Sequence, residues 1–238
     1  MVGSSATTLR ILAFDTSLRF GSLATLEGNA SEVNLLAERL LPHHQRSAQT
    51  LLPELSHLCS ECDWQPTQIE LISVTIGPGS FTGLRIGVTA AKALAFAVGA
   101  KLVGVHTLTA LAASVANSAG RLWTVLDAQR QELFVASFMG EELPPTPETQ
   151  ILSIEDWIAK LKPGDSVVGP PLARIGDRIP SEIHVVEENL WQPQARYVGK
   201  VGYDLFCSGI EMDLMQLVPN YYRKSAAEEK ADTASQKR

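Results

Sequence analysis

Residues 11–28 read ILAFDTSLRFGSLATLEG, and residues 123–140 read WTVLDAQRQELFVASFMG. Each stretch has an apolar run that ends in an acid (Asp15, Asp127), then a polar turn, a second apolar run and a closing glycine (Gly28, Gly140). Two apolar runs joined by a turn predict a β-hairpin. Every position of the second copy lies 112 residues beyond its counterpart, as Asp127 does beyond Asp15. This common offset favours a duplication, although two unrelated hairpins would share the same outline.

A repeated hairpin with an acid at the strand end resembles the actin, hexokinase and Hsp70 superfamily. The resemblance implies an α/β chain with a duplicated actin-like, ribonuclease H-like (ASKHA) fold, whose two lobes flank a nucleotide cleft. We expect a first lobe over residues 1–106, a smaller second lobe over 107–223 and a disordered tail over 224–238. Likeness at this level indicates fold and not function.

Apolar periodicity predicts the remaining elements. Strands are expected at 33–40, 71–76, 102–105, 167–168 and 183–186, and helices at 44–58, 82–98, 154–161 and 195–207. Pro53 lies inside the first of these helices and predicts a kink there.

A glycine-rich loop follows the strand expected at 71–76. Residues 77–87 read GPGSFTGLRIG, in which Ser80 or Thr82 can cap the next helix. Free N–H groups at a helix N-terminus attract anions, so one hypothesis is a phosphate site and the other is a plain strand-to-helix turn. The loop lacks the Lys-Ser or Lys-Thr pair of a P-loop, and its glycine spacing is not that of a dinucleotide fingerprint.

The helix expected over 82–98 is apolar around its whole circumference. Gly83, Gly87 and Ala91 recur every four residues and form a small-residue stripe that permits close packing. Arg85 and Lys92 are the charged residues between positions 83 and 100. Such a helix must be buried on more than one side, either within its own lobe or at a subunit interface.

Several motifs of the chain combine into a more specific pattern. They are AFDTS at 13–17, HQRS at 44–47, LLP at 51–53, the glycine loop at 77–87, LDA at 126–128 and PNYYR at 219–223. Together they resemble the TsaB (YeaZ) family of tRNA threonylcarbamoyladenosine biosynthesis proteins. The resemblance spans residues 9–223 and is weak between 140 and 194.

The resemblance implies a scaffold without catalytic residues. TsaB proteins dimerise with a catalytic paralogue, TsaD, which transfers threonylcarbamoyl to the adenosine beside the anticodon of tRNA, and an ATPase, TsaE, docks on the pair. This chain would then need no cofactor, because ATP and metal belong to the partner subunits. It would reach tRNA only through the complex, and it would form a homodimer when alone.

The resemblance also assigns residues. The partner contact falls on the helices at 44–58 and 82–98, with these interface residues expected: His44, Leu51, Leu55, Gly83, Ile86, Gly87, Ala90, Ala91 and Leu94. Four polar residues at the two hairpin turns are the candidate remnant of a nucleotide cleft: Asp15, Thr16, Ser17 and Asp127. Their alternative role is to form the turns by accepting backbone hydrogen bonds.

The residues do not suggest a metal site. His43 and His44 are adjacent, so on a helix they point about 100° apart, whereas two chelating histidines need one turn between them. Cys59 and Cys62 have the spacing of a zinc or redox half-site, but no second pair lies nearby. The alternative function is an ATP-dependent phosphotransferase or a glycoprotease-like peptidase of the same superfold. A weaker alternative is a homodimer that has no paralogous partner.

Composition limits the class of protein, its ligands and its cellular location. The 238 residues are 45% hydrophobic and 19% charged, which is typical of a globular protein. A net charge of −6 disfavours autonomous nucleic-acid binding, which depends on Lys and Arg. Three cysteines do not suggest a disulfide framework. No secretory signal or membrane span is evident, so we expect a cytoplasmic protein without a membrane partner.

Overall fold

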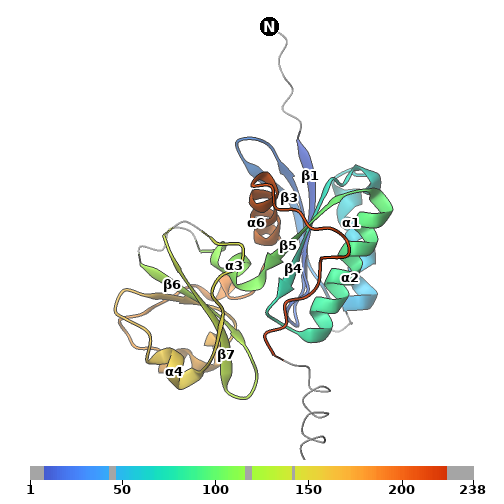
Figure 1. Cartoon of the computed structure of the whole chain (residues 1–238). Coiled ribbons are helices and arrows are strands. Elements are labelled where there is room, and N and C mark those ends of the chain that lie inside the picture. The colour runs from blue at the N-terminus through green and yellow to red at the C-terminus, as the bar shows by residue number, and fades with distance from the viewer. Residues whose placement is uncertain (1–7, 43–46, 116–119, 141–142, 224–238) are drawn as a thin grey trace, which may run out of the picture.

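The computed structural model describes residues 8–42, 47–115, 120–140 and 143–223, whose strands form two five-stranded sheets (Figure 1). The first sheet holds β1 (Leu9–Asp15), β2 (Ser22–Gly28), β3 (Val33–Leu40), β4 (Leu71–Gly77) and β5 (Lys101–His106). The second holds β6 (Arg121–Asp127), β7 (Glu132–Met139), β8 (Gln150–Ser153), β9 (Ser166–Val168) and β10 (His184–Val185). The α-helices are α1 (Ser47–Glu61), α2 (Phe81–Val98), α3 (Thr107–Ala112), α4 (Ile154–Ile158), α5 (Leu172–Ile175) and α6 (Ala195–Cys207). Short 3-10 helices cover Pro66–Gln68, Gly176–Arg178 and Glu188–Leu190.

The two sheets have the same topology. The first follows the order β3-β2-β1-β4-β5 and the second the order β8-β7-β6-β9-β10. In each, three consecutive antiparallel strands are extended by two parallel ones. Asp15 pairs with Ser22 and Asp127 with Leu133, so each acid ends the first strand of a hairpin. The predicted duplicated, two-lobed α/β fold is confirmed.

The first sheet lies between two helical layers. Leu12 and Phe14 of β1 face a core shared with α1 and α2. Ile11 and Ala13 point to the opposite face, where α6 covers the sheet (Figure 1). Side chains alternate between the faces of a strand, so a strand covered on both sides reads as a continuous apolar run. This is why residues 11–14 show no polar alternation.

The second sheet is also covered on both faces. Trp123 and Val125 of β6 pack with Trp157 of α4 and with α5. Leu122 and Leu126 pack on the other face against α3, through Leu108 and Leu111. The α3 helix directly follows β5, so it stands at the junction of the two lobes.

One boundary expected from the sequence needs correction. The second lobe was expected to extend over 107–223, but α6 returns to the first sheet. Ala195, Val198 and Val201 are buried against Ile11 and Leu26. The chain beyond α6 stays with the first lobe as well, since Leu217 lies in the core under α1 and α2. The α6 helix thus forms the second helical layer of the first lobe.

Other elements differ from expectation in detail. The helix expected at 154–161 ends as α4 at Ile158, and β8, α3 and α5 were not predicted. Pro53 lies inside α1. His44 and the tail over 224–238 fall outside the described residues. Within the described ranges α2 alone is long and apolar enough to cross a membrane, but buried helices of soluble proteins meet the same criteria, so this is weak evidence.

Candidate functional site

The carboxyl group of Asp15 is sealed inside the first lobe. Its side chain is completely buried, and its Oδ1 accepts hydrogen bonds from the Ser17 amide (3.1 Å) and the Thr75 hydroxyl (2.7 Å). Burial raises the pKa of Asp15, and the hydrogen bonds from Ser17 and Thr75 oppose this only in part. No described group bonds to Oδ2. A completely buried carboxyl group offers no accessible oxygen to a hydrated magnesium ion.

The glycine loop packs directly on the β1–β2 turn. The Ser80 amide donates to the Ser17 carbonyl (2.6 Å), and the Thr16 hydroxyl donates to the Gly83 carbonyl (2.8 Å). A Cβ at Gly79 would overlap Ser17, and one at Gly83 would overlap the Thr16 carbonyl oxygen. The start of α2 therefore meets backbone of its own lobe at this point, which supports the turn hypothesis over the phosphate hypothesis.

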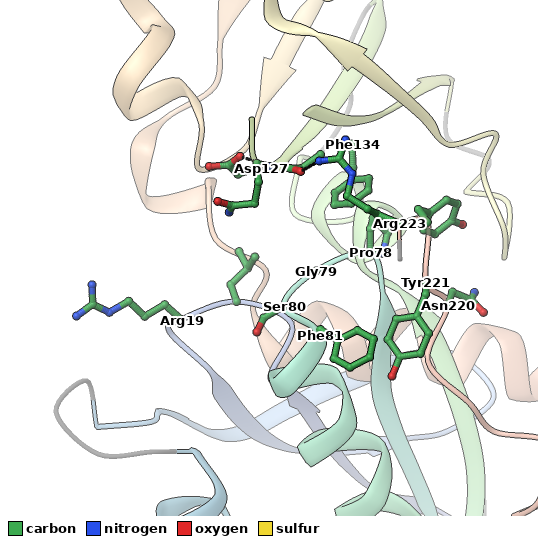
Figure 2. Close-up of a pocket in the computed structure, with 14 residues that line it drawn as sticks. Arg19, Pro78, Gly79, Ser80, Phe81, Asp127, Phe134, Asn220, Tyr221 and Arg223 are labelled. Atoms are coloured by element: carbon green, nitrogen blue, oxygen red, sulfur yellow. Dashed lines mark hydrogen bonds between the residues drawn. The ribbon is translucent and has the colours of Figure 1, made fainter. Parts of the chain in front are cut away.

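A pocket of about 430 Å³ lies between the lobes (Figure 2). Arg19 and Ser80 line it from the first lobe, and Asp127 lines it from the second. Asp127 accepts from the Gln129 amide at 2.7 Å, and its carboxylate lies 3.7 Å from the Arg174 guanidinium. Asp15 is not part of the lining, so the two acids of the duplicated hairpins do not face a common pocket. The cleft remnant proposed from sequence is divided between a buried acid and an exposed one.

The small residues of α2 serve its own lobe. Gly87 and Ala91 are buried, and a Cβ at Gly87 would overlap the Thr16 hydroxyl. Leu51 and Leu55 of α1 are likewise buried in the first core. The helical pattern left burial within the lobe and burial at an interface both open, and the family resemblance assigned these residues to the interface; the structure places the small-residue stripe inside its own lobe. The stripe lets α2 approach the β1–β2 turn and the sheet.

A different stripe of α2 is partly open to solvent. We call Ile86, Ala90, Ala93 and Ala97 the outer stripe, since their spacing of four, three and four residues aligns them on one face. Ala93 and Ala97 are exposed, while Ile86 and Ala90 are half-buried. Phe96 lies beside the outer stripe with 80% of its surface exposed. Leu94 is half-buried against the first core.

The two cations of α2 are held away from the outer stripe by the chain that follows α6. The Arg85 Nε donates to the Tyr221 hydroxyl at 2.9 Å, and the Lys92 Nζ donates to the Leu217 carbonyl at 3.3 Å. In the same segment Met215 and Val218 are exposed. The outer stripe is therefore an uncharged surface with exposed apolar side chains around it, a property typical of protein–protein contact sites.

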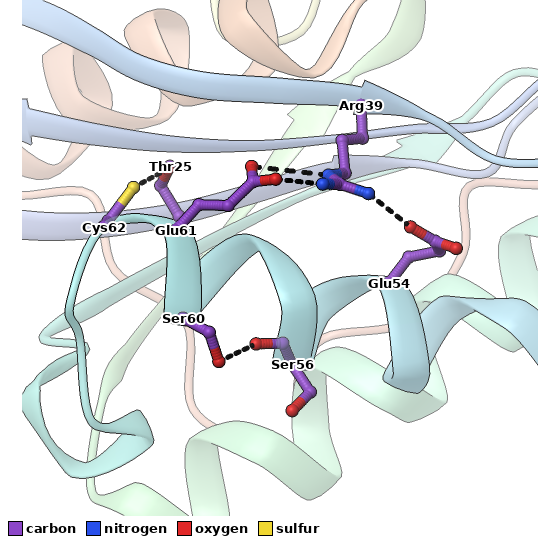
Figure 3. A network of polar contacts seen from close by, with 7 residues as sticks. All are labelled: Thr25, Arg39, Glu54, Ser56, Ser60, Glu61 and Cys62. Carbon is purple, nitrogen blue, oxygen red and sulfur yellow. Dashed lines mark hydrogen bonds and ion pairs between the residues drawn. The ribbon is translucent and has the colours of Figure 1, made fainter.

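Polar contacts join α1 to the first sheet (Figure 3). Arg39 of β3 pairs with Glu54 and Glu61 of α1. Cys62, just beyond the helix, contacts the Thr25 hydroxyl at 3.2 Å. Burial raises the pKa of the Cys59 thiol, and the neighbouring Cys62 adds to the shift, which disfavours a reactive thiolate. Among the described residues no three His, Cys, Asp or Glu side chains gather closely enough to hold a metal ion.

His106 joins the lobes. It ends β5 and caps α3, where its Nδ1 accepts the Leu108 amide at 3.3 Å. The Nε2 atom then carries the ring hydrogen and lies 2.8 Å from the Tyr222 hydroxyl and 3.3 Å from the Thr149 hydroxyl. Burial lowers the pKa of His106 from 6.5 to about 4. Protonation would also place a hydrogen on Nδ1, against the Leu108 N–H.

We expect His106 to make stability depend on pH. The unfolded chain takes up this proton below about pH 6.5, but the folded chain does so only near pH 4. The free energy of unfolding should therefore fall by up to about 3 kcal/mol as pH decreases through this window. Urea unfolding at several pH values measures the slope, which His106→Asn should flatten. Equal slopes for the two proteins would contradict the assignment.

Several residues of these surfaces were missed or misread in the sequence. No role was assigned to His106, Ala93 or Phe96. The available signal in the sequence was the large apolar side chain of Phe96 in a helix with few charges. The PNYYR motif at 219–223 was noted, but nothing in it shows that it runs between the lobes.

Comparisons with known proteins agree with this architecture. The family model described as TsaD: tRNA N6-adenosine threonylcarbamoyltransferase matches residues 40–236. The tRNA threonylcarbamoyladenosine biosynthesis protein TsaB of Bacillus subtilis is 28% identical over 233 residues, covering 93% of this chain and 97% of the relative. TsaB of Escherichia coli is 32% identical over 136 residues, covering 56% of this chain and 57% of the relative. The structure of YeaZ from Pseudomonas aeruginosa superposes with a TM-score of 0.73 at 22% identity, covering 90% of this chain and 99% of that one, and so shares the fold.

Proposed function

Because the chain belongs to the tRNA N6-adenosine threonylcarbamoyltransferase family, and within it to the TsaB (YeaZ) proteins of tRNA threonylcarbamoyladenosine biosynthesis, we propose that it is the non-catalytic subunit of the transferase complex. In this role it dimerises with a TsaD-like catalytic paralogue. The observation that carries the proposal is the outer stripe of α2, an uncharged surface on the side of the helix opposite its buried residues, with Ala93 and Ala97 exposed.

The surface fits a helical partner. Burying apolar area that is already free of charge gains the transfer free energy without a desolvation penalty for ions. Alanines at positions 90, 93 and 97 also allow the backbone of a second helix to come close. The exposed Phe96 supplies a larger side chain at the edge of the contact. This revised interface keeps Ile86, Ala90 and Leu94 of the expected set and adds Ala93 and Phe96.

The first-lobe turn supports the non-catalytic role. Asp15 is buried with a raised pKa, and the glycine loop fills the space in front of it. A phosphotransferase of this superfold would need an ionised, accessible acid and free amides at that place. We therefore assign ATP and metal to the partner subunits, with a TsaE-like ATPase docking on the assembled pair.

The same proposal implies how the chain reaches tRNA, how it self-associates and where in the cell it works. With a net charge of −6 the chain would reach tRNA only through the complex. The outer stripe would be covered by a second copy of the chain when the paralogue is missing. We place the complex in the cytoplasm, without a membrane partner.

Mixing the purified chain with purified TsaD-like paralogue tests the proposal. Light scattering coupled to size exclusion should give the mass of a one-to-one hetero-complex, because the paralogue competes for the surface that closes the homodimer. Two separate peaks at micromolar concentrations would contradict it.

A further inference from the structure

Residues Asn220–Arg223, which we call the strap, run from the first lobe to the second. The Asn220 amide donates to the Ile76 carbonyl at 2.7 Å, just where β4 ends. Gly77 makes this approach possible, since a Cβ there would lie 2.5 Å from the Asn220 carbonyl oxygen. The strap thus begins as a backbone extension of the first sheet. Figure 2 shows its residues on one wall of the interlobe pocket.

The second residue of the strap packs on the start of α2. The Tyr221 ring stacks on Phe81 with 4.5 Å between centroids. The Arg85 guanidinium lies 3.9 Å from the centre of the Phe81 ring and donates to the Tyr221 hydroxyl. Arg85 immediately precedes Ile86, the first residue of the outer stripe, and Tyr221 is 43% exposed. Arg85 points about 100° away from Ile86 around the helix, so a partner on the outer stripe contacts Tyr221 where its footprint extends past Arg85.

The last two residues of the strap bind the second lobe. The Tyr222 hydroxyl lies 2.8 Å from His106 Nε2, and its ring contacts Phe134 of β7 at 6.1 Å between centroids. Arg223 donates to the Ala128 carbonyl and pairs with Glu132, which lie on either side of the β6–β7 turn. Tyr221 packs on α2 of the first lobe and Tyr222 on β7 of the second, so the two neighbouring tyrosines reach different lobes.

We propose that the strap couples partner docking on the outer stripe of α2 to the position of the β6–β7 hairpin. Tyr221 and Arg223 are two residues apart, so the backbone between them spans at most about 7 Å and a displacement of Tyr221 is passed to Arg223. Docking that orders Tyr221 and Arg85 then stabilises the contacts of Arg223 with the second lobe. This regulation rests on the proposed function, because it requires a partner on α2.

Hydrogen exchange followed by mass spectrometry tests the coupling. The Ala128 and Glu132 amides are bonded to the Glu132 and Gln129 carbonyls within the turn, so their exchange reports opening of the hairpin. Adding the TsaD-like paralogue to the wild-type chain should slow exchange in α2 and, about threefold or more, in residues 128–132. In the double variant Tyr222→Phe/Arg223→Ala the slowing in α2 should remain and that in 128–132 should disappear.

A matched double variant serves as the control. Tyr203→Phe removes a hydroxyl that donates to the Asn29 carbonyl within the first lobe, and Arg178→Ala removes a guanidinium that pairs with Glu155 within the second. The control should keep the slowing at 128–132. Unchanged exchange of β1 and β2 in the strap variant verifies that its first lobe is folded.

The possible outcomes distinguish the coupling through the strap from the docking of the partner on α2. If the slowing at 128–132 persists in the strap variant, or is missing in the wild type while α2 is protected, the coupling is overturned and the docking stands. If the paralogue binds without protecting α2, the interface and the coupling both fail. If no complex forms, the proposed function fails, and with it the coupling.

Discussion

Replacing Ala93 by glutamate is expected to abolish assembly with the TsaD-like paralogue. Ala93 is exposed at the centre of the outer stripe, so the free chain tolerates the change, and glutamate is a good helix former. In the complex its carboxylate would be buried without a partner, at a cost of several kcal/mol. Since each 1.4 kcal/mol is tenfold in affinity, isothermal titration should show a loss of about 100-fold or more.

The second lobe offers a matched control. Ala173 of α5 is also an exposed helical alanine, and Ala173→Glu adds the same charge far from α2. Its affinity for the paralogue should stay within about twofold of the wild type, the range expected for a surface charge outside the contact. Equal affinities for the Ala93 and Ala173 variants would remove the outer stripe from the interface.

Replacing Gly83 by alanine should strongly destabilise the free chain. A Cβ at this position overlaps the Thr16 carbonyl oxygen, which is backbone and cannot rotate away. Overpacking of this kind costs about 3 kcal/mol, more than the gain of about 1 kcal/mol in helix propensity. Thermal unfolding of a chain of this size should then shift downward by about 5 °C or more.

Gly176 provides the comparison for this prediction. It has an ordinary helical φ of −55°, and a Cβ there meets open space. Gly176→Ala should leave the melting temperature unchanged or raise it slightly, because the unfolded chain loses conformational freedom. If Gly83→Ala and Gly176→Ala have the same melting temperature, the tight contact between α2 and the Thr16 turn does not contribute to stability.

The repeated hairpins explain why the fold was accessible from the sequence. Their strands are buried on both faces, so they stand out as continuous apolar runs with an acid at the same place. The β8 strand and the α3 helix are short and lie in segments without clear periodicity. A six-residue apolar stretch such as Thr107–Ala112 suits a buried strand as well as a helix.

The partner interface on α2 was harder to predict from the sequence than the fold, for a physical reason. Small residues at every fourth position permit close approach, but they do not say whether the neighbour is another chain or the same one. Gly83 and Gly87 approach Thr16, which is distant in sequence and adjacent only after folding. The return of α6 to the first sheet is hidden in the same way, because its amphipathic pattern identifies a buried face and not the sheet that buries it.

The raised pKa of Asp15 also depends on the fold. The sequence shows an acid at a strand end, where solvent access is common, as it is at Asp127. In the folded chain Asp15 is completely buried, with Thr75 of β4 on its carboxyl group and the glycine loop packed on the turn beside it. Two acids at equivalent positions of a duplication therefore have different environments.

Reconstituted tRNA modification tests the central claim most directly. Threonylcarbamoyl transferred to tRNA should be measured for the chain alone, for the TsaD-like paralogue with a TsaE-like ATPase, and for all three together at increasing amounts of this chain. We expect no product from the chain alone and a rate that saturates at one chain per paralogue. Product formed by this chain alone, or a paralogue equally active without it, would contradict the account.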